Sequence, residues 1–104
     1  MTVLRVCYQK GVRFDEKYYF EKHAPLAAPI MAALGVRKSE IVKVSGSVPG
    51  FDAPYQYVFS AYFDSPADVA RCMMDPRMNT VLDDVKNYFE GASDVMVGEV
   101  IATP

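Results

Sequence analysis

Apolar and polar residues alternate along three segments of the chain, with the two-residue period that is typical of β-strands. These segments are residues 2–9, 55–63 and 94–102. A shorter segment at about 40–45 has a similar character and leads into residues 46–54, where Gly, Ser and Pro predict a long loop. The pattern therefore predicts four strands.

Two segments with helical spacing separate these strands. The first follows Asp15, a favourable N-cap, and ends at Gly35. Its apolar face is formed by Tyr19, His23, Leu26, Ile30 and Leu34. The second begins at the Ser-Pro pair 65–66, and the Asp-Pro pair 75–76 repeats this start signal before Gly91 ends the segment. One long helix and one two-part helical segment are thus predicted.

The order strand, helix, strand, strand, helix, strand predicts a fold. Right-handed crossovers in each half give a ferredoxin-like α+β sandwich, with a four-stranded antiparallel sheet and both helical segments on one face. Residues 1–104 are expected to form one such domain. The other sheet face would expose many apolar side chains, and the chain has no spare element to cover them. A second copy packed sheet against sheet is the simplest cover, so we expect a homodimer.

Composition and charge narrow the class of protein. The 104 residues are 51% hydrophobic and 23% charged, which excludes a disordered tail and a disulfide scaffold. The net charge is −2 and no basic stripe is present, so nucleic acid is not expected as a partner. The longest uncharged apolar run, 24–36, is too short to cross a bilayer, and we expect no membrane association.

The cysteine and histidine content limits the kinds of metal site and catalytic site that the chain can form. Cys7 and Cys72 have no metal-binding spacing, and we interpret them as buried free thiols in a reducing cytoplasm. With His23 as the single histidine, a multi-histidine metal site within one chain is impossible. Asp83 and Asp84 are adjacent, so on a helix they point about 100° apart and form no acid pair. No metal or cofactor site is predicted.

His23 is the leading candidate for catalysis, because histidine titrates near neutral pH. Its spacing places it on the apolar helix face, toward the sheet. Pro25 and Pro29 cannot donate backbone hydrogen bonds, so they loosen the helix and open a cleft near the imidazole. There it would act as general base or acid toward a phenol, an enol or a β-keto group. The alternative is a structural role, in which His23 hydrogen-bonds a carbonyl freed by the prolines.

Aromatic and methionine side chains supply candidate ligand contacts. Either hydroxyl of the adjacent tyrosines 18 and 19 would reach a ligand, and methionine adapts to an apolar pocket. The same residue types at these spacings also pack cores, and that interpretation stays open. The candidate substrate-binding residues are Tyr18, Tyr19, Leu26, Tyr57, Phe59, Met73 and Phe89.

Several motifs resemble one known family. Residues 18–26 read YYFEKHAPL, which is similar to the signature of the EthD-like family, a Tyr-Tyr pair followed by His-x-Pro-Leu. Residues 55–65, 84–89 and 98–100 resemble its aromatic strand with the following helix start, its Asp-Val/Ile-x-Asn-Phe segment and its last strand. The chain departs at Tyr88, where the family more usually has Phe. The resemblance implies a dimeric α/β barrel with a helix–sheet cleft and makes His23 a site residue.

The family resemblance leaves three functions open. The first is a small cytoplasmic protein that binds a hydrophobic or phenolic molecule in the cleft, with His23 as proton carrier. As an enzyme of catabolic or secondary metabolism it would be a cofactor-independent lyase or cyclase, as relatives acting on aromatic polyketides imply. The second is a non-catalytic binding protein that accompanies a partner oxygenase, as the family's link to ethyl tert-butyl ether degradation implies. The third, haem- or flavin-linked oxidation, has no positive signal in the sequence.

Overall fold

The computed structural model describes residues 1–46 and 48–104, and within them four strands form one antiparallel sheet. The order across the sheet is β2-β3-β1-β4. The strands are β1 (Thr2–Gln9), β2 (Lys38–Lys43), β3 (Tyr55–Phe63) and β4 (Ser93–Glu99). The centre strands are therefore β1 and β3. The edge strand β4 pairs with β1, and the edge strand β2 pairs with β3. The predicted ferredoxin-like α+β fold with a four-stranded antiparallel sheet is confirmed.

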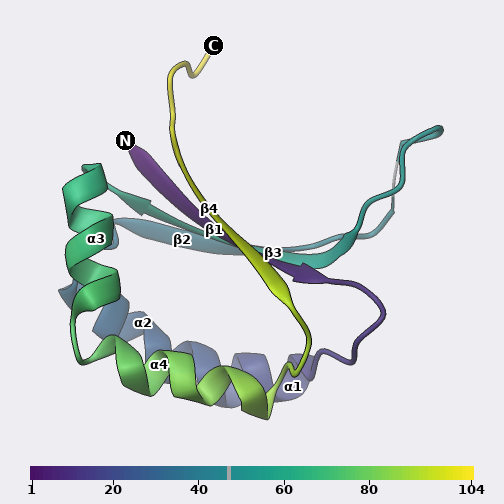
Figure 1. Ribbon diagram of the computed structural model, residues 1–104, viewed down its shortest axis with the longest axis horizontal. Coiled ribbons are helices and arrows are strands. Elements are labelled where there is room, and N and C mark those ends of the chain that lie inside the picture. The colour runs from purple at the N-terminus through teal and green to yellow at the C-terminus, as the bar shows by residue number, and fades with distance from the viewer. Residues whose placement is uncertain (47) are drawn as a thin grey trace.

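The helices all lie on one face of this sheet (Figure 1). The first helical segment consists of α1 (Glu16–Tyr18), the π-helical turn η1 (Tyr19–His23) and α2 (Ala24–Ala33). The second consists of α3 (Pro66–Met74), α4 (Met78–Asp84) and the 3₁₀ turn η2 (Val85–Asn87). The side chains of Asp15 and Ser65 accept hydrogen bonds from backbone N–H groups and cap α1 and α3, as their sequence positions predict. No helix in the described part of the chain is long and apolar enough to span a membrane.

The boundaries of two strands differ from the sequence prediction. The strand predicted at 40–45 spans Lys38–Lys43, because it is held in register opposite residues 57–62 of β3. The strand predicted at 94–102 ends at Glu99. β4 is an edge strand whose partner β1 begins at Thr2, and beyond it a single backbone bond, from the N–H of Val100 to the carbonyl of Met1, extends the contact.

The first helical segment is not one regular α-helix. Pro25 has no N–H to bond the carbonyl four residues earlier, and the chain instead forms a π-helical turn. This turn contains an extra residue and therefore rotates the buried face of α2 by about one position. Ala27 and Met31 are buried, whereas the predicted Leu26 is only half-buried. His23, at the end of the turn, is buried as predicted.

Two clusters of buried side chains hold the helices to the sheet. The larger is mostly aliphatic and includes Leu4, Ala61 and the fully buried Phe63. The smaller is aromatic, and its buried members are Tyr8, Tyr19, Tyr57, Tyr88 and Phe89. Phe14 lies within the aromatic cluster, where its ring stacks on that of Tyr57 with the centroids 3.9 Å apart. Both predicted buried thiols, Cys7 and Cys72, are free and buried.

Candidate functional site

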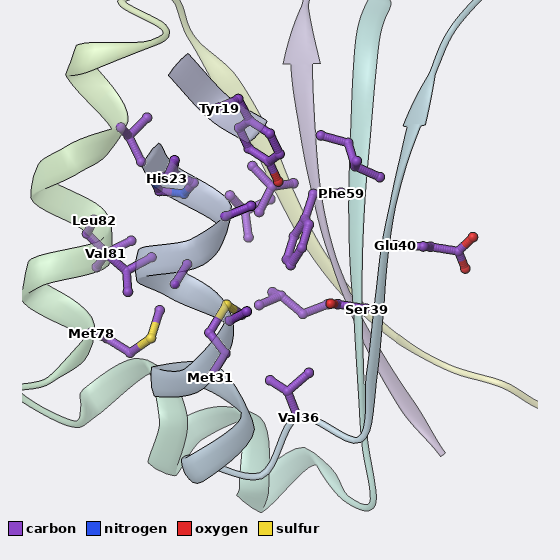
Figure 2. A pocket seen from close by; sticks show the side chains of 18 of the residues that line it. Tyr19, His23, Met31, Val36, Ser39, Glu40, Phe59, Met78, Val81 and Leu82 are labelled. Carbon is purple, nitrogen blue, oxygen red and sulfur yellow. The ribbon is translucent and has the colours of Figure 1, made fainter. Parts of the chain in front are cut away.

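A cavity of about 650 Å³ lies between the helices and the sheet. Its floor comes from β1, β2 and β3, and its walls come from η1, α2 and α4 (Figure 2). Four of the helical residues that line it are alanines, which leave more room than larger side chains would at those positions: Ala24, Ala27, Ala28 and Ala32. Protein interiors are normally close-packed, so small side chains at these positions leave a space that larger ones would fill. The alanine-rich sequence of α2 thus explains why space remains between this helix and the sheet.

The π-helical turn places His23 at one end of this cavity. The imidazole is only 6% exposed, yet it lines the cavity. Its ring lies 5.3 Å from the ring of Tyr19 and 4.5 Å from that of Tyr88, measured between centroids. The cleft that the proline pattern predicted beside His23 is therefore present.

Asp84, at the end of α4, holds the far side of the imidazole. Its Oδ2 lies 2.9 Å from Nδ1 of His23. Its Oδ1 accepts hydrogen bonds from the hydroxyl of Tyr18 at 2.6 Å and from the side-chain amide of Asn87 at 2.9 Å. Burial alone would raise the pKa of Asp84, but these donors and His23 outweigh it and lower the pKa below its ordinary value. Asp84 is thus an ionised carboxylate at neutral pH.

This contact fixes which imidazole nitrogen can accept a proton. A carboxylate only accepts hydrogen bonds, so Nδ1 of His23 carries the proton that it donates to Asp84. In the neutral ring, Nε2 then bears a lone pair. Its protein neighbour is the hydroxyl of Tyr88 at 3.4 Å, which is longer than a good hydrogen bond. Nε2 is therefore available to a molecule in the cavity.

Two buried tyrosine hydroxyls continue this network. The hydroxyls of Tyr8 and Tyr88 lie 2.8 Å apart, from β1 and from the end of η2. Burial raises the pKa of Tyr8 and of Tyr88 above the ordinary tyrosine value, so both stay protonated at neutral pH. The hydroxyl that distinguishes Tyr88 from the more usual Phe therefore links β1 to His23.

Comparison with known proteins places the chain in a family. The model of the EthD domain matches residues 13–92. The chain belongs to the EthD family. Comparison with curated proteins gave no match.

Solved structures agree with this assignment. An EthD-like protein from Ralstonia eutropha is 25% identical, with a TM-score of 0.78 over 99% of this chain and 94% of that chain. An EthD family protein from Bacillus halodurans is 22% identical, with a TM-score of 0.76 over 97% of this chain and 99% of that chain. SnoaB, a cofactor-independent oxygenase from Streptomyces nogalater, is 15% identical, with a TM-score of 0.68 over 98% and 92%. The Bacillus halodurans protein and SnoaB are less than 25% identical to this chain, so their similarity shows a shared fold alone.

The structure of this EthD protein brings some of the predicted site residues together. Tyr19, Phe59 and Met73 line the same cavity as His23. Tyr18 lies behind the imidazole, where its hydroxyl donates to Asp84.

Three other predicted ligand contacts do not line the cavity. Leu26 was expected on the sheet-facing stripe, but the π-helical turn rotates it away. Tyr57 packs on Phe14, and its hydroxyl donates to Glu16 at 2.7 Å. Phe89 packs edge-on against Tyr8 in the aromatic cluster.

Sequence reasoning missed the residues that orient and flank His23. Asp84 has no predicted site role: it appears only as the neighbour of Asp83 and as the first residue of the family-like segment 84–89. Yet it lies three residues after the buried Val81 and four before the buried Tyr88. That spacing puts Asp84 beside the buried helix face, and it is the sequence feature that could have identified Asp84 as a site residue. Among residues 1–46 and 48–104 no group of three His, Cys, Asp or Glu side chains is placed to hold a metal ion.

The Tyr8–Tyr88 pair gives a prediction on stability. Replacing Tyr88 by Phe is expected to destabilise the protein by about 1–3 kcal/mol, because the buried hydroxyl of Tyr8 loses its partner. Replacing both tyrosines by Phe removes both polar groups, so the double variant is expected to be more stable than Tyr88→Phe alone. Urea unfolding of the wild type, of Tyr8→Phe, of Tyr88→Phe and of the double variant measures these free energies. A double variant less stable than either single variant would contradict this account.

Proposed function

We propose that this EthD protein binds a small uncharged molecule in the helix–sheet cavity and that His23 moves a proton to or from it. The observation that carries this proposal is an imidazole that lines an apolar cavity, is held by Asp84 at Nδ1 and makes no short bond to the protein at Nε2. A histidine with a structural role alone would use both ring nitrogens in short bonds to the protein. Here the bond at Nε2 is long.

The lining of the cavity favours an apolar ligand with few polar groups. A volume of about 650 Å³ is within the range of pockets that bind drug-sized molecules. The charged residues that line it, Arg37, Lys38 and Glu40, are on or beside the exposed edge strand β2. Figure 2 shows Glu40 directed away from the cavity. An ionic ligand would thus lose its hydration without gaining a buried counter-charge.

The chemistry that fits this site is proton transfer without a cofactor. Nε2 of His23 removes a proton from a carbon beside a carbonyl group, or from a phenol, and the electron pair of the broken bond moves onto the ligand oxygen. The imidazolium formed is stabilised by the carboxylate of Asp84. Return of the proton to another carbon of the same ligand completes an isomerisation. In a cyclisation the carbanion bonds to a second carbonyl carbon of the ligand, and the imidazolium returns the proton to the alkoxide that forms. In a lyase step the electron pair expels a leaving group from the neighbouring carbon, and that group takes the proton. One structural neighbour is described as a cofactor-independent oxygenase, which agrees with cofactor-free chemistry in this fold.

The experiment that tests this function follows hydrogen exchange at carbon. 2-Tetralone, a bicyclic ketone of suitable size, is incubated with the protein in D₂O, and loss of its α-proton NMR signals is compared with buffer alone. The proposal expects faster exchange in the presence of the protein. Saturable binding of 2-tetralone and of a panel of phenols and enols, with no accelerated exchange or conversion, would instead support the non-catalytic accessory function.

We also propose that the protein is a homodimer formed through the sheet face that the helices leave open. This face presents Val42, Val58 and Tyr62. Along β2 and β3 these residues alternate with the residues that face the helices. Met96 lies on the same face beside Arg5. Val42 is 49% and Met96 47% exposed, so the face presents large apolar side chains at both of its edges.

The dimer proposal predicts the mass in solution. Light scattering after size-exclusion chromatography is expected to give twice the 11.6 kDa of one chain. Replacing both Val42 and Met96 by Glu is expected to give the mass of one chain, because four carboxylates would be buried in the dimer. Val12→Glu, an exposed apolar residue outside the sheet, is the matched control. A monomeric wild type would contradict the proposal.

A further inference from the structure

The cavity has one polar end and one apolar end. Tyr19 and His23 lie at the first (Figure 2). At the other end the walls come mainly from Met31, Val36 and Met78, with the exposed Ser39 on the strand side. None of the first three side chains has a hydrogen-bonding group of ordinary strength, and methionine adapts its shape to different apolar neighbours. A ligand that fills the cavity therefore needs different chemistry at its two ends.

The hydroxyl of Tyr19 is a buried polar group that lines the cavity and has no protein partner in the described residues. Tyr19 is only 5% exposed, and Figure 2 shows its hydroxyl directed into the cavity. Within the described chain no hydrogen bond is made by this hydroxyl, whereas the hydroxyls of Tyr8 and Tyr88 bond each other. No side-chain polar atom of the described residues is both fully sealed and without a partner, so the Tyr19 hydroxyl must open onto the cavity.

The protonation state of Tyr19 makes it a donor. Burial raises the pKa of Tyr19 above the ordinary value, and the hydroxyl stays protonated at neutral pH. A buried donor without a partner is unfavourable, and a ligand oxygen would satisfy it. The ring of Tyr19 lies 5.3 Å from that of His23, so one ligand head group can contact both side chains.

We propose that the ligand is an amphiphilic phenol or ketone that binds in one orientation, with its oxygen on the Tyr19 hydroxyl and its apolar body among Met31, Met78 and Val36. This inference rests on the proposed function, because it assigns the ligand class to the same cavity. The atom that exchanges a proton with His23 is then the phenol oxygen itself or a carbon adjacent to the carbonyl group. Tyr19 stabilises the negative charge that proton removal leaves on the oxygen.

Two probe molecules separate the contribution of the polar head group to binding from that of the apolar body. 4-Butylphenol and butylbenzene have the same body, and they differ by the hydroxyl alone. The affinity of each is measured by NMR titration for the wild type, for Tyr19→Phe and for the control Tyr62→Phe, whose hydroxyl donates to Glu40 on the opposite sheet face. We expect Tyr19→Phe to bind 4-butylphenol about fivefold more weakly and butylbenzene no more weakly than the wild type. Equal effects on both probes, or no effect, would overturn the assignment of Tyr19.

The orientation of the bound ligand is tested separately, by NOEs and by a series of alkylphenols. In the complex with 4-butylphenol, the terminal methyl of the butyl chain is expected to show NOEs to the Met31 and Met78 methyl groups, and the ring protons beside the hydroxyl to His23. Each methylene added from 4-ethylphenol to 4-butylphenol is expected to tighten binding by about fourfold. The reverse pattern of NOEs would overturn the proposed orientation.

These outcomes are distinguishable from failure of the proposed function. If 4-butylphenol binds head-first and 2-tetralone still shows no catalysed exchange, the ligand class stands and the proton-transfer function is wrong. If exchange is catalysed but Tyr19→Phe has no selective effect on 4-butylphenol, the ligand orientation is wrong and proton transfer by His23 stands.

Discussion

Replacing His23 by Gln is expected to lower the rate of protein-catalysed hydrogen exchange into 2-tetralone by at least about 10²-fold. A general base contributes about 10²- to 10⁴-fold to a rate, and glutamine has no lone pair basic enough to take the proton. Glutamine can still donate a hydrogen bond to Asp84, so the position keeps a partner for the carboxylate. The fold and the affinity for 4-butylphenol are therefore expected to change far less than the exchange rate.

The control for this variant is its exposed neighbour on the same turn. Lys22→Gln makes the same type of replacement one residue earlier, at an exposed position that does not line the cavity. It is expected to leave exchange within about twofold of the wild type, in line with the small effects of surface substitutions. Exchange that survives in His23→Gln, with binding intact, would remove His23 from the mechanism.

The second large effect is expected at Asp84. Asp84→Asn keeps the shape of the side chain but removes the charge that stabilises the imidazolium. The amide can also donate a hydrogen bond, so it no longer fixes the proton on Nδ1. We expect the exchange rate to fall by about 10²-fold or more, since loss of the equivalent carboxylate in a catalytic triad lowers kcat by about 10⁴-fold. Affinity for 4-butylphenol is expected to change little, because Asp84 does not line the cavity.

Asp83→Asn is the matched control, because it removes the same charge from an exposed neighbour. If this variant loses as much activity as Asp84→Asn, the effect is one of net charge and the role given to Asp84 is wrong. The two variants are compared by the same exchange assay in D₂O and by urea unfolding. The wild-type rate in Asp84→Asn would show that the imidazole needs no orienting carboxylate.

The strands and the fold were predictable because their signals are local. Alternation along residues 2–9 and 55–63 identifies the two central strands with their full lengths. The edge strands were placed less well, since their ends depend on where the partner strand begins and stops. Local periodicity contains no information on that register.

The site was predictable only in part, for two physical reasons. The π-helical turn changes the helical period at His23, so Leu26, counted at a regular spacing beyond it, is displaced from the buried face. Asp84 reaches His23 across 61 positions of sequence, from the second half of the fold. No spacing rule reports a contact between two helices that are so far apart in the chain, and only the packing of α4 beside η1 reveals it.

The hydroxyl of Tyr88 illustrates the same point. As a departure from the usual Phe it had no assigned role, because its partner Tyr8 is on β1, 80 positions away. In the structure this hydroxyl connects the centre of the sheet to the imidazole. The network of Asp84, His23, Tyr88 and Tyr8 therefore joins elements from both halves of the domain around one end of the cavity.

The most direct test of this account is a long-range ¹H–¹⁵N NMR spectrum of the imidazole at neutral pH, with and without 4-butylphenol. The chain has a single histidine, so the signals need no assignment among residues. Neutral His23 is expected to carry its proton on Nδ1, and its Nε2 signal is expected to shift when 4-butylphenol binds. A proton on Nε2 in the free protein, or an imidazole spectrum that is unchanged at saturating 4-butylphenol, would contradict this account.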